Sequence, residues 1–147
     1  MRYFEDFVPG QVYELGSRSV SAEQIVAFAR EFDPQPFHVD EAAARSSPFG
    51  GLIASGWHTC AIFTRLLVDS LLADSASMGS PGVEEVRWPK PVRPGDVLTG
   101  QAVVLEARAS ERNPIRGTVK FEFELRNAAG EHVFLARSRG LFRRRET

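Results

Sequence analysis

One long helical segment that is apolar on almost every side, followed by a change of hydrophobic period, is the feature that most constrains this fold. From about residue 56 to residue 74, apolar side chains cover most of the helix circumference instead of one stripe, which is typical of a buried helix. After a loop at residues 75–82, the period becomes that of a strand, and residues 119–125 alternate strictly between apolar and charged. This alternation predicts a strand with one face on a core and the other toward water.

Further strands are predicted around this one. Residues 97–107 and 133–142 are strand candidates, and residues 83–88 are a weaker one. Asn113-Pro114 and the segment 127–130 supply turns. Several consecutive strands with short turns, preceded by one apolar helix, predict an antiparallel sheet wrapped around that helix, an α+β arrangement of layers.

Another helix is predicted ahead of the long one, and it leads into a stiff loop. Ser21 and Gln24 have the spacing of a capping box, and apolar residues follow with the spacing of a one-sided helix. A proline disfavours the α conformation in the residue before it, so this helix should end at about Asp33. The loop that follows contains two prolines and carries a carboxylate and an imidazole, Asp33 and His38. Asp40 should cap a short helix directly after the loop.

The size and composition of the chain limit the class of protein. Its 147 residues favour one domain, which we place at residues 1–147. Apolar residues make up 43% and charged residues 25%, as in ordinary globular proteins. A net charge of -1 gives no long-range attraction to nucleic acid or to an anionic membrane surface. We therefore expect neither as a partner.

The expected location is the cytoplasm. The single Cys60 excludes an intrachain disulfide. The first six residues contain acids where a signal peptide has basic and then apolar residues. No apolar run approaches the roughly 20 residues that a membrane helix needs.

Three segments carry a resemblance to a known family. In order and spacing they resemble the MaoC-like dehydratases, which include the (R)-specific enoyl-CoA hydratases, and the resemblance covers nearly the whole chain. The segments are Asp33-Pro34-Gln35-Pro36-Phe37-His38-Val39-Asp40, Phe49-Gly50-Gly51-Leu52-Ile53-Ala54-Ser55-Gly56 and Pro91-Val92-Arg93-Pro94-Gly95-Asp96.

The resemblance implies a fold, an assembly and a reaction. The fold is the hot-dog fold, in which the sheet wraps a long helix, here at about residues 56–74. The assembly is a homodimer or a higher homo-oligomer, with subunits paired through their sheets and active sites at the interface. The reaction is syn addition of water to a trans-2-enoyl thioester of coenzyme A or acyl carrier protein, or the reverse dehydration. Coenzyme A enters as part of the substrate, and no other cofactor is expected.

This chemistry needs a base for the water, a proton for the α carbon and stabilisation of the enolate oxygen. Asp33 and His38 could supply the first two, in either order. The free N–H groups at the start of the long helix suit the oxygen, and Gly56 is the candidate because it would let a thioester approach closely. The alternative is that Gly56, like the glycines before it, only permits a turn.

Two positions depart from the family pattern. Gln35 stands where Asn is common, so its amide keeps a hydrogen bond that orients the loop, with a different geometry. Ser55 stands where His is frequent. We favour a structural role for Ser55 as the cap of the long helix over a substrate contact.

Other reactive side chains have no supporting pattern. His58 is interpreted as a surface histidine in preference to a pocket residue, and Cys60 as a small inert hydrophobe. The three histidines lack the spacing of a zinc site, so no metal is expected. The run at residues 143–145 is interpreted as a solvated basic tail. Arg93 and Arg116 are candidates for contact with coenzyme A phosphates.

Two other functions remain open on the same fold. In a thioesterase, a carboxylate would activate water toward the thioester carbonyl. In a non-catalytic subunit, the chain would bind acyl thioesters or dimerise without turnover. The presence of both Asp33 and His38 argues for the hydro-lyase over the non-catalytic subunit.

Overall fold

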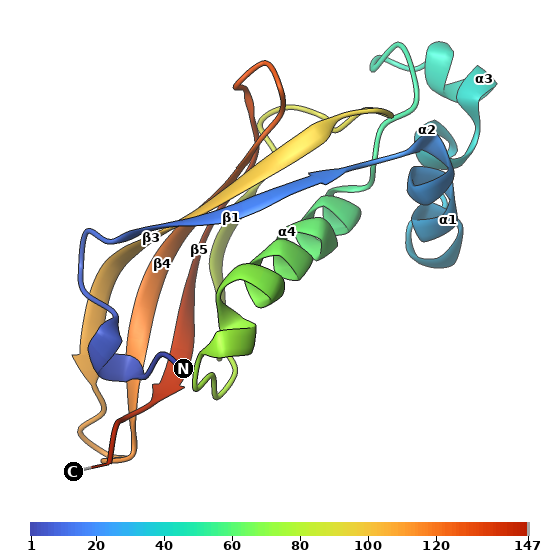
Figure 1. The fold of residues 1–147 in the computed structure, drawn as a ribbon. Helices are drawn as coiled ribbons and strands as arrows, with labels where there is room; N and C mark the ends of the chain where they lie inside the picture. Colours follow the sequence, from blue (N-terminus) through green and yellow to red (C-terminus); the bar gives the residue numbers. More distant parts are fainter. Residues whose placement is uncertain (147) are drawn as a thin grey trace.

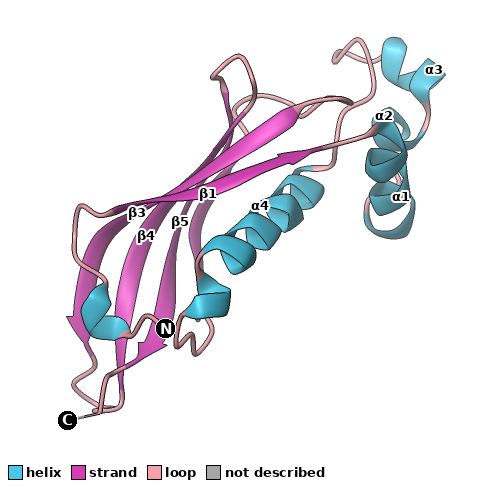
Figure 2. Ribbon diagram, viewed as in Figure 1, coloured by secondary structure: helices cyan, strands magenta, loops and turns pink. Residues whose placement is uncertain are grey.

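The computed structural model describes residues 1–146 as a curved sheet with one long helix across its concave face (Figure 1). Three short helices project beyond one end of the sheet, and both chain termini lie at the other end (Figures 1 and 2). The α-helices are α1 (Ala22–Phe32), α2 (Pro36–Val39), α3 (Glu41–Arg45) and α4 (Gly56–Ser70), with 3-10 turns at Phe4–Asp6 and Leu72–Asp74. The strands are β1 (Val12–Ser19), β2 (Gly82–Arg87), β3 (Val97–Ala109), β4 (Arg116–Arg126) and β5 (His132–Arg143).

The sheet has five strands in the order β1-β3-β4-β5-β2, and every neighbouring pair is antiparallel. The alternation predicted for residues 119–125 is confirmed, because β4 buries the side chains of Val119, Phe121, Phe123 and Leu125. The helix α4 joins this core through Phe63, whose ring centroid lies 4.7 Å from the ring centroids of both Phe123 and Phe134. The core therefore forms between one helix and the concave face of the sheet.

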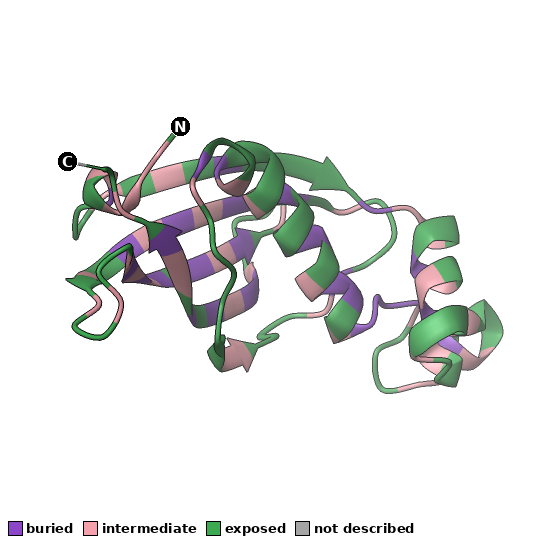
Figure 3. Ribbon diagram, turned by 90° about the horizontal axis from the view of Figure 1, so that it is seen from below, coloured by how far each residue is buried: buried purple, intermediate pink, exposed green. Residues whose placement is uncertain are grey.

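The long helix is shorter and less covered than the sequence predicts. The α-helix ends at Ser70, and a 3-10 turn at Leu72–Asp74 completes the predicted segment. Only one side of α4 is buried, since Trp57 is 61% exposed and Val68 is 38% exposed. The prediction of a helix buried on all sides is therefore wrong for the single chain. One side of α4 stays exposed (Figure 3), and the apolar residues Trp57 and Val68 lie on it.

The strand β1 was not anticipated, because it does not alternate. Among its residues only Leu15 is buried. Gly16 has a φ of +82° and lies at a register shift between β1 and β3. A bulge of this kind breaks the period-two pattern on which strand prediction depends. As the edge strand next to β3, β1 still contributes to the core that α4 covers.

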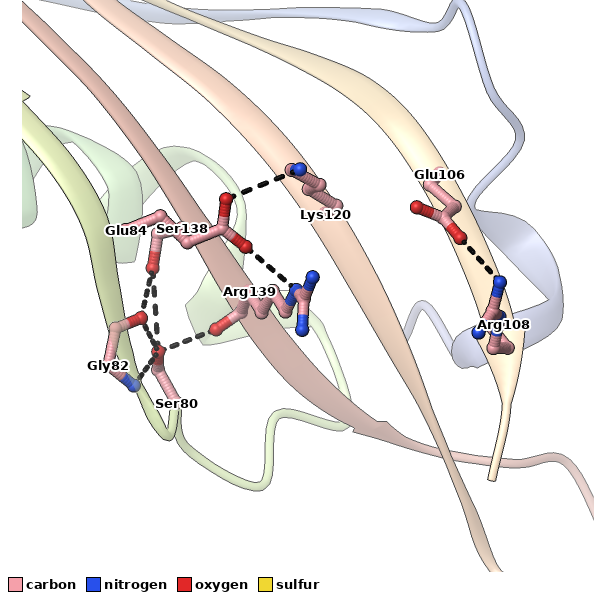
Figure 4. Close-up of polar contacts among 8 residues, drawn as sticks. All are labelled: Ser80, Gly82, Glu84, Glu106, Arg108, Lys120, Ser138 and Arg139. Atoms are coloured by element: carbon pink, nitrogen blue, oxygen red, sulfur yellow. Dashed lines mark hydrogen bonds and ion pairs between the residues drawn. The ribbon is translucent and has the colours of Figure 1, made fainter. Parts of the chain in front are cut away.

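The outer face of the sheet is polar and joined by ion pairs across strands (Figure 4). Glu84 lies at a register shift between β2 and β5, and its carboxylate pairs with Lys120 at 3.2 Å and with Arg139 at 2.9 Å. Arg108 pairs with Glu106 at 3.2 Å on β3. Exposed pairs of this kind contribute about 0–1 kcal/mol each to stability, so this face is a solvated surface and not a second core.

The basic run at the C-terminal end is largely exposed to solvent, as predicted, but it is not a free tail. Arg143 is the last residue of β5. The next guanidinium, of Arg144, pairs with Glu5 at 3.1 Å, and that of Arg145 pairs with Asp6 at 2.7 Å. Acidic residues near the N-terminus thus lie against the end of β5, far from the helices α1 to α3 (Figure 1).

Candidate active site

The helix α1 places Asp33 at its C-terminal end. The predicted capping box is confirmed, because Ser21 Oγ accepts from the N–H of Gln24, and the Gln24 side chain accepts from the N–H of Ser21. Asp33 is the C-cap residue of α1. Its φ is −152°, and its N–H donates to Ala29 O at 2.8 Å. The helix therefore ends where Pro34 requires it to end.

His38 lies on a short helix in the loop that was predicted as a rigid turn. Pro36 is the first residue of this helix, α2, where its missing N–H costs nothing. The imidazole is 4% exposed, and its Nδ1 lies 2.6 Å from Ile53 O. Since a carbonyl oxygen only accepts, Nδ1 carries a proton, and in the neutral ring Nε2 is an acceptor. Nε2 lies 3.4 Å from Oδ2 of Asp33.

Both carboxylate oxygens of Asp33 accept side-chain hydrogen bonds. The Ser55 hydroxyl donates to Oδ2 at 2.7 Å, and Gln35 Nε2 donates to Oδ1 at 2.7 Å. The predicted cap role of Ser55 is confirmed, because its Oγ also accepts from the N–H of Trp57 at 3.3 Å. Gln35 does hold a hydrogen bond within the loop, with Asp33 as its partner. Asp40 likewise caps α3 by accepting from two backbone N–H groups, as predicted.

These contacts keep Asp33 ionised. Partial burial raises the pKa of Asp33, but the hydrogen bonds from Ser55 and Gln35 and the nearby His38 outweigh it, so the pKa lies below its usual value of 3.8. A carboxylate stabilised in this way accepts hydrogen bonds near neutral pH but is a weak base.

The structure explains why residue 56 has no side chain, which the sequence alone did not explain. A Cβ atom there would lie 2.6 Å from Cε2 of Trp88, whose indole packs directly over the backbone. Gly56 does not have a positive φ, so no turn requires it. Among residues 1–146 no acceptor pairs with its N–H. The N–H thus remains free at the positive end of the α4 dipole.

His58 is not the surface residue that we predicted. It is 9% exposed, and its ring stacks on Phe28 with centroids 4.7 Å apart and an interplanar angle of 8°. Its Nδ1 is buried and has no hydrogen-bond partner among the described residues. Burial, and then the charge of Arg18, lowers the pKa of His58 below its usual value of 6.5. The prediction for His58 failed because α1, through Phe28, covers this side of α4.

The remaining candidate residues are Arg93, Arg116 and Cys60. Arg93 lies beside the segment that precedes α4, and its Nη2 donates to Phe49 O at 2.8 Å. Arg116 pairs with Arg143 in the sheet register, at the end that holds both termini, and so lies far from Asp33 (Figure 1). Burial raises the pKa of the Cys60 thiol, which keeps it protonated and unreactive.

Two functional groups in this region were missed. The Ile53 carbonyl orients His38, and no sequence signal marks a backbone acceptor. Trp88 is the last residue of the weakly predicted strand and directly follows β2 in the structure, and its contact with Gly56 is long-range. Within residues 1–146 no group of three or more His, Cys, Asp and Glu side chains could hold a metal ion, and no helix is long and apolar enough to span a bilayer.

Comparison with known proteins agrees with this architecture. The MaoC like domain model matches residues 6–125. The uncharacterized protein YdeM of Bacillus subtilis is 36% identical over 111 residues, which are 76% of this chain and 78% of YdeM. The 3-hydroxybutyryl-CoA dehydratase of Methylorubrum extorquens is 31% identical over 105 residues, which are 71% of this chain and 64% of that enzyme.

A solved structure extends the similarity to the whole chain. The crystal structure of the MaoC-like dehydratase from Rhodospirillum rubrum has a TM-score of 0.92 and 44% identity, with 100% of each chain covered. The antiparallel sheet around a long helix is therefore the predicted hot-dog fold. This chain belongs to the MaoC-like dehydratase domain family.

Proposed function

We propose that this protein is a hydro-lyase that adds water to a trans-2-enoyl thioester, or removes it from the (R)-3-hydroxyacyl thioester, with Asp33 and His38 as the acid/base pair. One observation carries the proposal. Asp33 Oδ2 and His38 Nε2 face each other at 3.4 Å, and both are acceptors when the ring is neutral. This distance is longer than a normal hydrogen bond. A water molecule that donates one proton to each atom satisfies both.

The hydrogen-bond partners of Asp33 and His38 support a different role for each. Asp33 is the weaker base, because two donors hold its charge. His38 Nε2 therefore takes a proton from the water as the oxygen attacks the β carbon. The resulting imidazolium is stabilised by the Asp33 carboxylate beside it. His38 then returns that proton to the α carbon, so that one water is consumed and both residues regain their starting states.

The start of α4 stabilises the charge that develops on the substrate. When water attacks the β carbon, electrons move to the thioester oxygen. The N–H of Gly56 is free among the described residues and lies at the positive end of the helix dipole. It is the proposed donor to this oxygen. The M. extorquens relative, named a 3-hydroxybutyryl-CoA dehydratase, supports a coenzyme A thioester as substrate. An acyl carrier protein thioester is the alternative carrier.

A second copy of the chain is part of the proposal. The apolar face of α4 that carries Trp57 is uncovered in one chain. β2 is an edge strand, and Trp88, which directly follows it, packs against Trp57 with ring centroids 5.3 Å apart. A homodimer that covers both would remove apolar surface from water.

The test is an assay with short trans-2-enoyl-CoA thioesters. Purified protein should deplete the conjugated absorbance without release of free thiol, which a thiol-reactive dye monitors in parallel. Thiol release with the enoyl group intact would favour the thioesterase reaction. Folded protein that is inert toward straight, branched and dicarboxylic acyl groups of several lengths would overturn the proposal.

A further inference from the structure

We infer that Ser55 is a positioning residue, whose hydroxyl holds the Asp33 carboxylate in register with the start of α4, and that it is not a donor to the thioester oxygen. The inference rests on the proposed function for its effect on turnover. The effect of the Ser55 hydroxyl on the Asp33 carboxylate can be measured without substrate.

The hydroxyl of Ser55 has no proton to spare. Ser55 is 0% exposed, and its Oγ lies 2.7 Å from Asp33 Oδ2 and 3.3 Å from the N–H of Trp57. A hydroxyl has one proton to donate and lone pairs to accept. Because the N–H must donate to Oγ and a carboxylate only accepts, the one proton lies toward Asp33. Ser55 therefore cannot also donate to a substrate oxygen while this contact exists.

The contact connects two elements that must act together. Asp33 and Ser55 are 22 residues apart, at the end of α1 and at the cap of α4. The oxygen that Ser55 binds, Oδ2, is also the one that faces His38 Nε2. Gln35 holds the other oxygen, but it is exposed and lies on the same loop as Asp33. Ser55 is thus the buried donor that fixes the distance between the Asp33 and His38 pair and the helix start.

The direction of the Asp33 pKa agrees with this role. Partial burial raises the pKa, and the Ser55 hydrogen bond is the largest of the effects that lower it. Among residues 1–146, His38 is the titratable side chain in contact with Asp33. Loss of the Ser55 hydroxyl should therefore raise the pKa of Asp33 and free its carboxylate to rotate.

Two substitutions separate positioning from helix capping. Ser55→Gly removes the hydroxyl at a position where glycine is a well-tolerated helix cap, whereas Ser55→Ala removes both the donor and the cap. Ser21→Ala is the matched control, because Ser21 is also a serine cap with a capping box but lies at the opposite end of α1 from Asp33.

The first measurement is an NMR titration of the Asp33 side-chain carboxyl carbon, with the signal assigned through Asp33→Asn. Ser55→Gly and Ser55→Ala should both titrate at a higher pH than the wild type, and Ser21→Ala should titrate like the wild type. An unchanged Asp33 titration in Ser55→Gly would overturn the inference, whether or not the protein is an enzyme.

The second measurement is turnover of a short enoyl-CoA across pH. Ser55→Gly should lower kcat about tenfold, as expected for loss of a hydrogen bond to a charged group, with KM little changed and the acidic limb of the pH profile at a higher pH. A Ser55→Gly enzyme with the wild-type kcat and pH profile would contradict the inference. If the wild type turns over no thioester but the titration shifts, the proposed function fails and the positioning role stands.

Discussion

Two buried imidazoles flank the start of α4, and they differ in what surrounds them. His38 is 4% exposed and His58 is 9% exposed. His38 has an acceptor at Nδ1 and a carboxylate facing Nε2. His58 has an unpaired Nδ1 and a phenyl ring against its face. The cavity of about 390 Å³ beside it is lined by apolar side chains and by Arg18, Ser19, Gln24 and Arg65, and by no carboxylate among the described residues.

The difference shows that burial alone does not make a histidine reactive. Burial lowers the pKa of His58, and Arg18 adds to this effect, so the ring stays neutral. Its buried Nδ1 also has no partner among the described residues with which to exchange a proton. His38 is more buried, but the Ile53 carbonyl fixes its tautomer and Asp33 can stabilise its charged form. Proton transfer requires this second set of contacts.

The largest effect on the reaction rate is expected for substitution of His38 or of Asp33 beside it. Asp33→Asn or His38→Ala should each lower the rate of enoyl-CoA hydration on the order of 10²- to 10⁴-fold, because each removes a group that orients or transfers the proton. Steady-state assays measure this, and circular dichroism checks that the variants are folded. Rates within about twofold of the wild type would reject the assignment, since proton-transfer groups contribute far more.

A middle-sized effect is expected at Gly56, which lies next to both histidine sites. Gly56→Ala should lower the free energy of unfolding by about 1–3 kcal/mol, because the new methyl group would overlap the Trp88 indole. Urea denaturation measures the loss. In a Trp88→Leu background the same substitution should cost much less. An equal cost in both backgrounds would show that Trp88 is not what requires glycine.

The smallest effect is expected for substitution of His58, and it concerns how stability depends on pH. The folded-state pKa of His58 lies below the usual 6.5, so the unfolded chain binds its proton at the higher pH. Stability should therefore fall as the pH is lowered through about 6.5. His58→Phe should flatten this dependence between about pH 7.5 and about pH 5, with turnover close to that of the wild type. Urea denaturation across pH tests this, and identical slopes in the two proteins would contradict a buried neutral His58.

Local patterns account for the parts of the fold and site that the sequence predicts. The Ser21 capping box and Pro34 define α1 and place Asp33 at its end. Strict alternation defines β4. The strand β1 escaped prediction because Gly16 introduces a bulge and only Leu15 is buried.

Contacts between distant segments account for the rest. Whether His58 is exposed depends on α1 packing beside α4, which no local pattern encodes. The contact of Ser55 with Asp33 spans 22 residues and depends on how the loop folds back. The indole of Trp88 packs over Gly56 for the same kind of reason. Local sequence thus predicts which residues carry the chemistry, whereas their geometry requires the tertiary structure.

The central claim is that Asp33 and His38 act jointly on one water molecule, and a double-mutant cycle tests it most directly. The rates of enoyl-CoA hydration are compared for the wild type, Asp33→Asn, His38→Ala and the double variant. Groups that act as a unit are strongly non-additive, so the double variant should be no slower than about the slower single variant. Losses that multiply would show that the two residues act independently and would contradict the account.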